Sequence, residues 1–512
     1  MAMGQKKSSR RWVQVLIAVL VIVAGLLIIK SKYGKHHPVA TTPETAHHGE
    51  TEKMMGINST PPEKLESFKS VTGVLNIQHW VTARGVNVYF VPVPTLPMVD
   101  IEIIFDAGAA RNGDKGGLAY LTNTLLAEGT ANMTADQVAE SFDKVGAQFN
   151  AESQRDMALV HLRSLSERAQ LGEAVNTLAA ILSNPAFPLE GFKREQQNTL
   201  SALKQQEQKP QQVASKAFTS ALYGKQPYAN WVLGDEASIK ALTPEDLRAF
   251  YQKYYTAKNA TVAIVGDLSA EDADALAQKL TNNLPEGEKA QALPPVAGLT
   301  EKITKKIDFP SAQTTILVGQ PGMIQNDPDY YALAVGNHIL GGNGSVTRVF
   351  NTIRNQHGLA YSAYSYFLPM REKGPFVMGC QTRNDQADKA LAMMQELLKE
   401  FVEKGPTEKE LEQAKQNLLG GYALQFDSNA SICHEIAALG FYNLPLNHFN
   451  EFKDAVSKLT VEDIKKAFEK RISPEKVVIV TVGGGDKQVT KPTAEGASEP
   501  EPMQRGPGGV QH

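Results

Sequence analysis

Cysteine, net charge and long apolar runs are scarce in this 512-residue sequence, and each scarcity excludes a class of protein. Only two cysteines are present, Cys380 and Cys433, which are too few for a disulfide framework and lack metal-site spacing, so we expect buried thiols. The formal net charge of -3 argues against nucleic-acid binding, because phosphate contacts need a concentrated basic surface. With 42% hydrophobic and 21% charged residues, the composition is that of a globular protein of about two to four domains.

One long apolar run is present, at residues 12–29. As a helix it would span about 27 Å, close to the thickness of a bilayer core. Four basic residues precede it between positions 6 and 11, and no small-residue cleavage site follows at once. We therefore expect an uncleaved single-pass anchor within residues 1–30, with the N-terminus in the cytoplasm, in a bacterial inner membrane, and the bulk of the protein in the periplasm.

Polar segments separate the anchor from the rest and mark the expected domain boundaries. Residues 31–68 are rich in His, Pro, Thr and Glu, and residues 486–512 are rich in Pro, Gly and Glu, so we expect a disordered tether and a disordered tail. Residues 270–300 form the expected interdomain linker region, in which Glu286–Thr300 has the Pro and polar content of an exposed linker.

An internal repeat indicates that the remaining sequence is duplicated. Leu242–Gly266 and Leu459–Gly483 align without a gap. Each begins with a Thr at an expected helix N-cap, Thr243 or Thr460, and continues into an amphipathic helix and a β-branched strand that ends at Gly. Strand-like and helical patterns alternate through both copies, so we predict an α+β fold with helix-covered sheets in two halves, residues 69–269 and 301–485.

The stretch Gly117–Thr130 follows an apolar, strand-like run and has helical periodicity. Tyr120, Asn123 and Thr124 should therefore share one face of a helix. In a zinc helix with the spacing H-x-x-E-H, that face carries two His ligands and a general base. None of the eleven histidines in the sequence forms this pattern elsewhere. The stretch is thus either an unrelated helix or a zinc helix that has lost its ligands.

Three segments in a fixed order carry a family resemblance: Gly117–Thr130, Pro227–Tyr255 and Leu340–Ser365, which reads LGGNGSVTRVFNTIRNQHGLAYSAYS. Together they resemble the pitrilysin and mitochondrial processing peptidase family, the inverzincin zinc metallopeptidases, over nearly all of Lys69–Gly485. The resemblance implies two homologous halves, each a mostly antiparallel sheet covered by helices. Any one segment alone would be weak evidence, but their order and spacing support one another.

The zinc site of that family does not carry over. Tyr120 stands at the position of the first His, Asn123 at that of the general-base Glu, and Thr124 at that of the second His. Glu195 matches an acidic position seven residues before the third ligand, so Ala202 stands where that ligand would be. Zinc prefers imidazole, thiolate and carboxylate ligands. The resemblance therefore implies that this chain binds no zinc and that Glu195 is a structural residue of its helix.

A second feature of the family is retained. Members that complete the active site from the second half use an Arg and a Tyr seven residues apart, and Arg354 and Tyr361 have this spacing. The resemblance implies that Arg354 holds a substrate carbonyl and that Tyr361 donates to the oxyanion of the transition state. The alternative is structural: a surface ion pair for Arg354 and packing on the sheet for Tyr361.

These residues together imply a non-catalytic, zinc-free subunit of a heteromeric zinc metalloendopeptidase, inactive alone. In two-chain members of the family, one subunit supplies the metal helix and the other the Arg/Tyr pair. The expected partner is a zinc-bearing homologous subunit, in a heterodimer or larger assembly, and the expected substrate is a peptide or unfolded protein. The alternative is a scaffold or peptide-binding protein with no role in hydrolysis. An autonomous zinc peptidase is disfavoured because the ligands and the base are missing.

Other clusters carry weaker signals. His434 and Glu435 lie beside Cys433, but adjacent residues on a helix point in different directions, so a shared metal is not expected. The glycines Gly341, Gly342 and Gly344 lack the Lys and Ser or Thr of a phosphate-binding loop and are expected to form a flexible turn.

Overall fold

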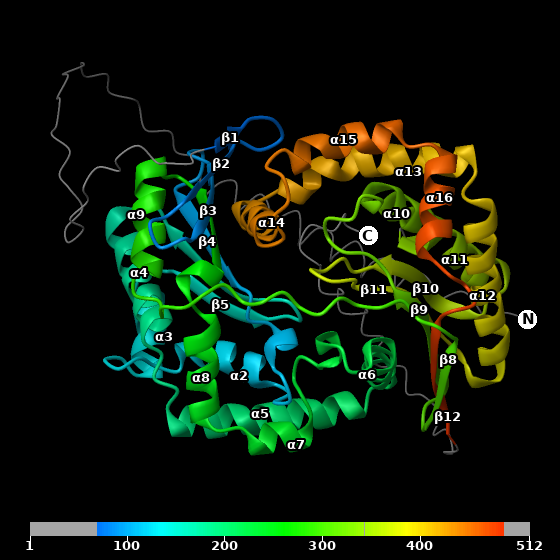
Figure 1. Cartoon of the computed structure of the whole chain (residues 1–512), viewed down its shortest axis with the longest axis horizontal. Coiled ribbons are helices and arrows are strands. Elements are labelled where there is room, and N and C mark those ends of the chain that lie inside the picture. Colours follow the sequence, from blue (N-terminus) through cyan, green and yellow to red (C-terminus); the bar gives the residue numbers. More distant parts are fainter. Residues whose placement is uncertain (1–68, 343, 486–512) are drawn as a thin grey trace, which may run out of the picture. The chain divides into compact units, whose positions relative to one another are not determined.

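A computed structural model describes residues 69–342 and 344–485, whose strands form two separate sheets covered by helices (Figure 1). The expected anchor at residues 12–29, the tether at 31–68 and the tail at 486–512 lie outside the described residues. Within those two described ranges, no helix is long and apolar enough to cross a membrane. The two-sheet α+β fold predicted from the sequence is confirmed.

The first sheet has seven strands in the order β1-β2-β3-β7-β4-β6-β5. Its neighbouring strands are antiparallel except for the parallel pair β3 and β7. The strands are β1 (Lys69–Val71), β2 (Ile77–Val81), β3 (Asn87–Pro92), β4 (Met98–Phe105), β5 (Gln148–Ser153), β6 (Ala158–Leu165) and β7 (Ala260–Gly266).

The second sheet has five strands in the order β10-β11-β9-β12-β8, and its one parallel pair is β8 and β12. The strands are β8 (Ile303–Phe309), β9 (Gln313–Pro321), β10 (Ala360–Phe367), β11 (Pro375–Arg383) and β12 (Val478–Gly484). Each sheet therefore has the mostly antiparallel pairing that the family resemblance implies.

One face of the first sheet carries helices whose apolar side chains form a single core with Phe90, Ile103 and Ile264. The helices in that core are α2 (Leu118–Thr124), α3 (Ala135–Lys144), α4 (Arg168–Ser183), α5 (Leu189–Glu207), α7 (Glu236–Ala241), α8 (Pro244–Tyr254) and α9 (Ala270–Thr281). The composition places residues 270–281 in the linker region, but in the structure they form α9, because Leu276 and Leu280 are buried and the helix packs on α4 and β3.

The α-helices of eight or more residues in the described second half are α10 (Tyr330–Asn337), α12 (Ala387–Lys404), α13 (Glu408–Gly421), α14 (Asn429–Phe441), α15 (His448–Lys458) and α16 (Val461–Arg471). The internal repeat corresponds to α8 with β7 and to α16 with β12. Thr243 and Thr460 are N-caps whose hydroxyls accept hydrogen bonds from the backbone N–H groups of Asp246 and Asp463. The duplicated helix–strand unit is thus confirmed.

Two helices are exchanged between the sheets. Helix α6 (Pro210–Tyr223), from the first half of the sequence, packs on β9 and β12 of the second sheet, and α14 packs on β3, β4 and β7 of the first sheet. In Figure 1, α14 lies beside the first sheet, far in sequence from its strands. Gly440 permits this close approach, because a Cβ there would lie 2.3 Å from the ring of Tyr89.

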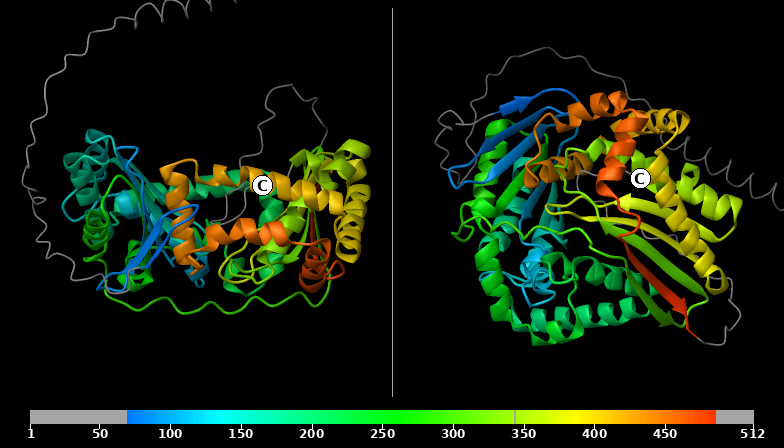
Figure 2. Two further views of the ribbon diagram at one scale, coloured as in Figure 1. Left: turned by 90° about the horizontal axis from the view of Figure 1, so that it is seen from above. Right: turned by 45° about the vertical axis from the view of Figure 1, so that its right-hand side comes forward.

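The segment that connects α9 to β8 is extended and has no helix or strand (Figure 2). Leu293 and Val296 are buried with the side chains of α6, which differs from the exposed linker that the polar composition predicts. Arg111 donates to the carbonyl of Gln291, and Asn259 accepts from the backbone N–H of Ala290. Buried apolar contacts and these hydrogen bonds hold the linker in place.

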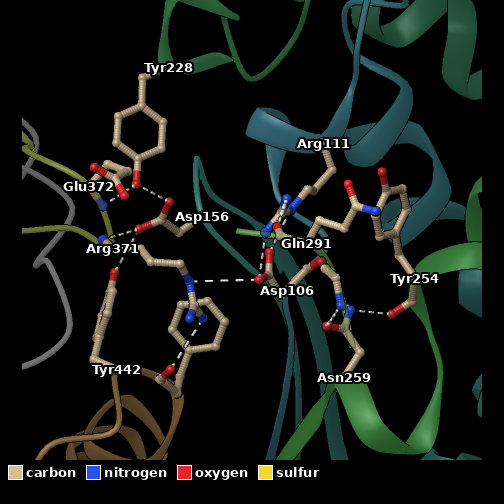
Figure 3. A network of polar contacts seen from close by, with 12 residues as sticks. Asp106, Arg111, Asp156, Tyr228, Tyr254, Asn259, Gln291, Arg371, Glu372 and Tyr442 are labelled. Atoms are coloured by element: carbon tan, nitrogen blue, oxygen red, sulfur yellow. Dashed lines mark hydrogen bonds and ion pairs between the residues drawn. The ribbon is translucent and has the colours of Figure 1, made fainter. Parts of the chain in front are cut away.

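A buried polar network ties the halves together at the turn between β10 and β11 (Figure 3). The carboxylate of Asp156 accepts hydrogen bonds from the Tyr228 hydroxyl at 2.5 Å, the Arg371 backbone N–H at 2.7 Å and the Tyr442 hydroxyl at 3.3 Å. The Tyr228 hydroxyl also accepts from the backbone N–H of Glu372. Asp156 and Tyr228 come from the first half, and the other residues come from the second.

Candidate functional site

Asn123, which stands at the general-base position, is buried on α2. Its side-chain amide is hydrogen-bonded to neighbouring residues. Its side-chain nitrogen donates to the carbonyls of Glu152 at 2.7 Å and Leu159 at 3.1 Å. Its side-chain oxygen accepts from the hydroxyl of Tyr255 at 3.0 Å, and Tyr255 is fully buried. Asn123 therefore ties α2 to β5, β6 and the end of α8, with its amide oxygen and nitrogen both in use.

The other two positions on α2 form a small polar cluster with α5. The phenol of Tyr120 interacts with the hydroxyl of Thr124 and with the carboxylate of Glu195. Burial raises the pKa of Tyr120 above its ordinary value, and the charge of Glu195 adds to that shift. Tyr120 is therefore a neutral phenol at pH 7. Glu195 faces the site positions, whereas Ala202, on the same helix, offers only a methyl group.

These residues do not fit a zinc ion. A neutral phenol, a fully hydrogen-bonded amide, a hydroxyl and a methyl group supply none of the imidazole or thiolate ligands that zinc prefers, and Glu195 is the only carboxylate among them. Across the described part of the chain, no group of three or more His, Cys, Asp or Glu side chains is placed to hold a metal ion. At these positions α2 makes hydrogen-bond and packing contacts with β5, β6 and α8.

In the second half, Arg354 and Tyr361 lie against each other. The Arg354 guanidinium carbon is 4.5 Å from the centroid of the Tyr361 ring and 4.8 Å from that of the Phe350 ring. The Tyr361 side chain is 77% exposed. Neither the guanidinium of Arg354 nor the hydroxyl of Tyr361 has a hydrogen bond or ion pair with another residue of the ranges 69–342 and 344–485. Arg354 is only partly exposed, whereas the ring of Tyr361 lies at the surface.

The backbone around this pair departs from regular geometry. Arg354 lies in a π-helical turn at Asn351–Gln356, which follows the short helix α11 (Arg348–Phe350). Tyr361 lies in β10, whose pairing with β11 shifts register between Ala360 and Ala363. Such bulges re-aim side chains at the edge of a sheet, and β10 is an edge strand. The bulge accounts for the outward direction of a large aromatic side chain.

Gly341 and Gly342 do not form the flexible turn that the sequence predicts. Gly341 and Gly342 are buried in a π-helical turn at His338–Gly342, which packs against β10. A Cβ at Gly341 would lie 2.4 Å from the backbone nitrogen of Ser365. Because it has no side chain, Gly341 allows this turn to pack closely on β10. Gly344, with a φ of 50°, follows in an exposed turn.

Cys433 and His434 make separate contacts, as expected for adjacent residues on a helix. The Cys433 thiol is buried and donates to the carbonyls of Asp100 and Ala263. His434 pairs with Glu102 on β4 at 3.0 Å. Burial lowers the pKa of His434, but the hydrogen bond and charge of Glu102 outweigh it and raise that pKa to about 9. His434 is thus a charged contact between α14 and the first sheet. Cys380 is also buried, which confirms both thiol predictions.

Two contacts at these sites were not anticipated from the sequence. Tyr255 lies at the end of the segment Pro227–Tyr255, yet nothing in its local pattern indicates the bond to Asn123, more than a hundred residues earlier. Phe350 stands four residues before Arg354, and that spacing is a signal for contact on a helix. The second contact could therefore have been found from the sequence, whereas the first depends on the tertiary fold.

Comparison with known proteins gives the family. Residues 91–236 match the family model described as Insulinase (Peptidase family M16), and residues 241–418 match the one described as Peptidase M16 inactive domain. A crystal structure of a peptidase M16 inactive domain from Pseudomonas fluorescens has 39% sequence identity, covers 82% of this chain and 100% of its own, and superposes with a TM-score of 0.78. The chain belongs to peptidase family M16. The family predicted from the three sequence segments is therefore confirmed.

Relatives within M16 carry differing names. A protein from Rickettsia felis, named an uncharacterized zinc protease, is 27% identical over 74% of this chain and 91% of its own length. A protein from Helicobacter pylori, named non-peptidase homolog YmxG, is 29% identical over 75% of this chain and 90% of its own length. Membership of M16 therefore leaves the activity of this chain to be argued from its own residues.

Proposed function

We propose that this M16 chain is a zinc-free, non-catalytic subunit of a heteromeric zinc metalloendopeptidase, inactive alone, which supplies Arg354 and Tyr361 to the active site of a zinc-bearing homologous partner. The observation that carries the proposal is the contrast between the two sites. The amide of Asn123 is fully hydrogen-bonded inside the protein, whereas Arg354 and the exposed Tyr361 lie against each other and have no hydrogen bond to another residue of the described ranges.

The two residues have separate roles in the proposed reaction. Arg354 donates from its planar fork of N–H groups to a carbonyl of the bound peptide, which holds the substrate before and during the reaction. Tyr361 donates its hydroxyl to the oxyanion that develops at the carbonyl under attack. The structural alternative would need an ion pair for Arg354 and a packed ring for Tyr361, and neither contact exists among the residues the structure describes.

The peptide is expected to lie in an extended conformation along a sheet edge, so main-chain hydrogen bonds give affinity with little sequence preference. In the proposed organisation, residues 69–269 and 301–485 are two peptidase-like domains. Residues 12–29 anchor them to a bacterial inner membrane from the periplasmic side. A fusion of alkaline phosphatase after residue 485 tests the orientation, since the enzyme is active only in the periplasm. An inactive fusion would contradict it.

The test of the function is reconstitution with the zinc-bearing homologous chain from the same genome. We expect Tyr361→Phe to lower kcat by about a hundredfold to a thousandfold, as loss of one oxyanion donor does, and Arg354→Ala to raise KM. Arg248→Ala and Tyr254→Phe are matched controls, because Arg248 is exposed and both residues lie on α8, which packs on the first sheet. Full activity in both site variants would refute the proposal.

Metal analysis separates this proposal from the alternatives. We expect zinc in the purified partner and less than stoichiometric zinc in this chain. Equimolar zinc bound to this chain alone would instead indicate an autonomous peptidase. If this chain binds a protein that lacks peptidase activity and leaves the zinc-bearing relative unbound, the scaffold function is correct.

A further inference from the structure

Arg354 is held by a second aromatic ring besides Tyr361. Its guanidinium lies over the ring of Phe350 at 4.8 Å and over that of Tyr361 at 4.5 Å. Cation–π attraction is effective within about 6 Å of a ring centroid, so both contacts are attractive. A guanidinium that stacks its faces on rings keeps its N–H groups free, because these lie in its plane. The two rings therefore restrict the guanidinium without using its hydrogen-bond donors.

The helical spacing of Phe350 and Arg354 accounts for their contact. Residues four apart on a helix are neighbours on its surface. Phe350 ends α11, and Arg354 lies in the π-helical turn at Asn351–Gln356 that follows directly. The continuous helical path therefore places the Phe350 ring beside the guanidinium.

The start of this helix is fixed independently of the rings. Arg348 donates two hydrogen bonds of 2.6 Å to the carboxylate of Glu410, near the N-terminus of α13. The same guanidinium donates to the carbonyl of Gly405 and lies 5.1 Å from the ring centroid of Phe401. Because α11 is anchored in this way, Phe350 has a defined position even though its side chain is only half-buried.

We propose that Phe350 is a positioning residue that holds the Arg354 guanidinium ready for a peptide carbonyl. This inference rests on the proposed function of Arg354. A free Arg side chain must lose rotamer freedom when it binds, and that loss weakens affinity. Phe350 and Tyr361 impose most of this loss before the peptide arrives. Phe350 touches neither the substrate nor the reacting atoms, and it acts only through Arg354.

Kinetics of the reconstituted peptidase provide the first test, with Phe350→Leu, Phe350→Tyr and Phe309→Leu. We expect Phe350→Leu to raise KM by about threefold to tenfold, the range that matches immobilisation of one flexible side chain, and to leave kcat within about twofold. Phe350→Tyr keeps a ring and should retain the wild-type KM. Phe309 is also half-buried but lies on β8 at the opposite edge of the same sheet, so Phe309→Leu should leave KM unchanged.

The second readout is independent of the partner and uses the full-length chain alone. Arginine-selective ¹⁵N labelling reports the Nε–Hε resonance of Arg354, assigned through its loss in Arg354→Lys. Ring currents from Phe350 should shift this resonance, so Phe350→Leu should move it and Phe350→Tyr should largely preserve it. An unmoved resonance in Phe350→Leu would overturn the inference, since no ring would then be acting on the guanidinium.

The combined outcomes separate this inference from the proposed function. If Arg354→Ala raises KM but Phe350→Leu does not, Phe350 has no positioning role, while the proposed function stands. If Arg354→Ala and Tyr361→Phe both retain full activity, the proposed function fails and the role of Phe350 in binding fails with it. A raised KM in Phe350→Leu together with the moved resonance, both restored in Phe350→Tyr, supports the inference.

Discussion

Removal of the Tyr228 hydroxyl is the sharpest test of how the two halves are joined. This buried hydroxyl donates to Asp156 at 2.5 Å and accepts from the backbone N–H of Glu372 at 2.9 Å (Figure 3). Burial raises the pKa of Tyr228 well above its ordinary value, so the hydroxyl keeps its proton and remains a donor at every pH of interest. Tyr228→Phe deletes both hydrogen bonds while leaving the ring in place.

The losses of these two hydrogen bonds have different free-energy costs. A hydrogen bond to a charged carboxylate contributes about 1.5–3 kcal/mol, and an orphaned backbone N–H costs about 1–3 kcal/mol when it is fully buried. Glu372 is only partly buried, so water can reach its N–H and the lower end of the second range applies. We therefore expect Tyr228→Phe to destabilise the turn at Arg371 and Glu372 by about 2–4 kcal/mol.

Amide hydrogen exchange followed by mass spectrometry measures this change at the turn itself. A loss of about 2–4 kcal/mol corresponds to exchange about thirtyfold to a thousandfold faster for a peptide that covers residues 368–374, because each 1.4 kcal/mol is a factor of about ten. Tyr251→Phe is the matched control, since its buried hydroxyl donates to the Leu182 carbonyl within the first half. Equal exchange in wild type and Tyr228→Phe, or equal acceleration in Tyr251→Phe, would refute the reasoning.

Two further changes have predicted outcomes. Asn123→Ala leaves the Tyr255 hydroxyl and two carbonyls without their partner, so we expect a loss of about 2–4 kcal/mol in urea unfolding, against less than about 0.5 kcal/mol for the more exposed Thr124→Ala. Although burial raises it, the pKa of Glu410 is lowered to about 2 by hydrogen bonds from Arg348 and Thr407. A depressed pKa stabilises the fold above the unfolded value of about 4.3. The advantage of wild type over Glu410→Gln should therefore shrink as the pH falls from 5 toward 2, and an unchanged difference in unfolding midpoint would contradict this.

Local patterns in the sequence were sufficient to predict the repeated helix–strand unit. Thr243 and Thr460, each followed by an Asp three residues later, define helix starts through contacts between near neighbours, so pattern alone predicts them. The contact between Arg354 and Tyr361 was predictable only through the family resemblance, because an Arg and a Tyr seven residues apart carry no local signal on their own. Burial of Cys380 and Cys433 followed from their scarcity and spacing.

Long-range features could not be read in the same way. Apolar periodicity shows that α6 and α14 each have a buried face, but it cannot say which sheet covers that face. The composition of Glu286–Thr300 indicates an exposed linker. Only the fold shows that Leu293 and Val296 are buried by side chains of α6. Tyr255 and Asn123 meet through packing of α8 on α2, which no local rule specifies. The register shift in β10 likewise depends on its partner strand.

The exchange of α6 and α14 constrains how the chain can be synthesised. Translation proceeds at about 5–20 residues per second, so roughly 8–30 s separate the last strand of the first sheet, β7, from the start of α14. During that interval α14 is not yet available to cover its face of the first sheet, which includes the apolar residues Ile104 and Val265. We therefore expect a chain that ends before residue 429 to expose this apolar face, and large exposed apolar patches favour aggregation.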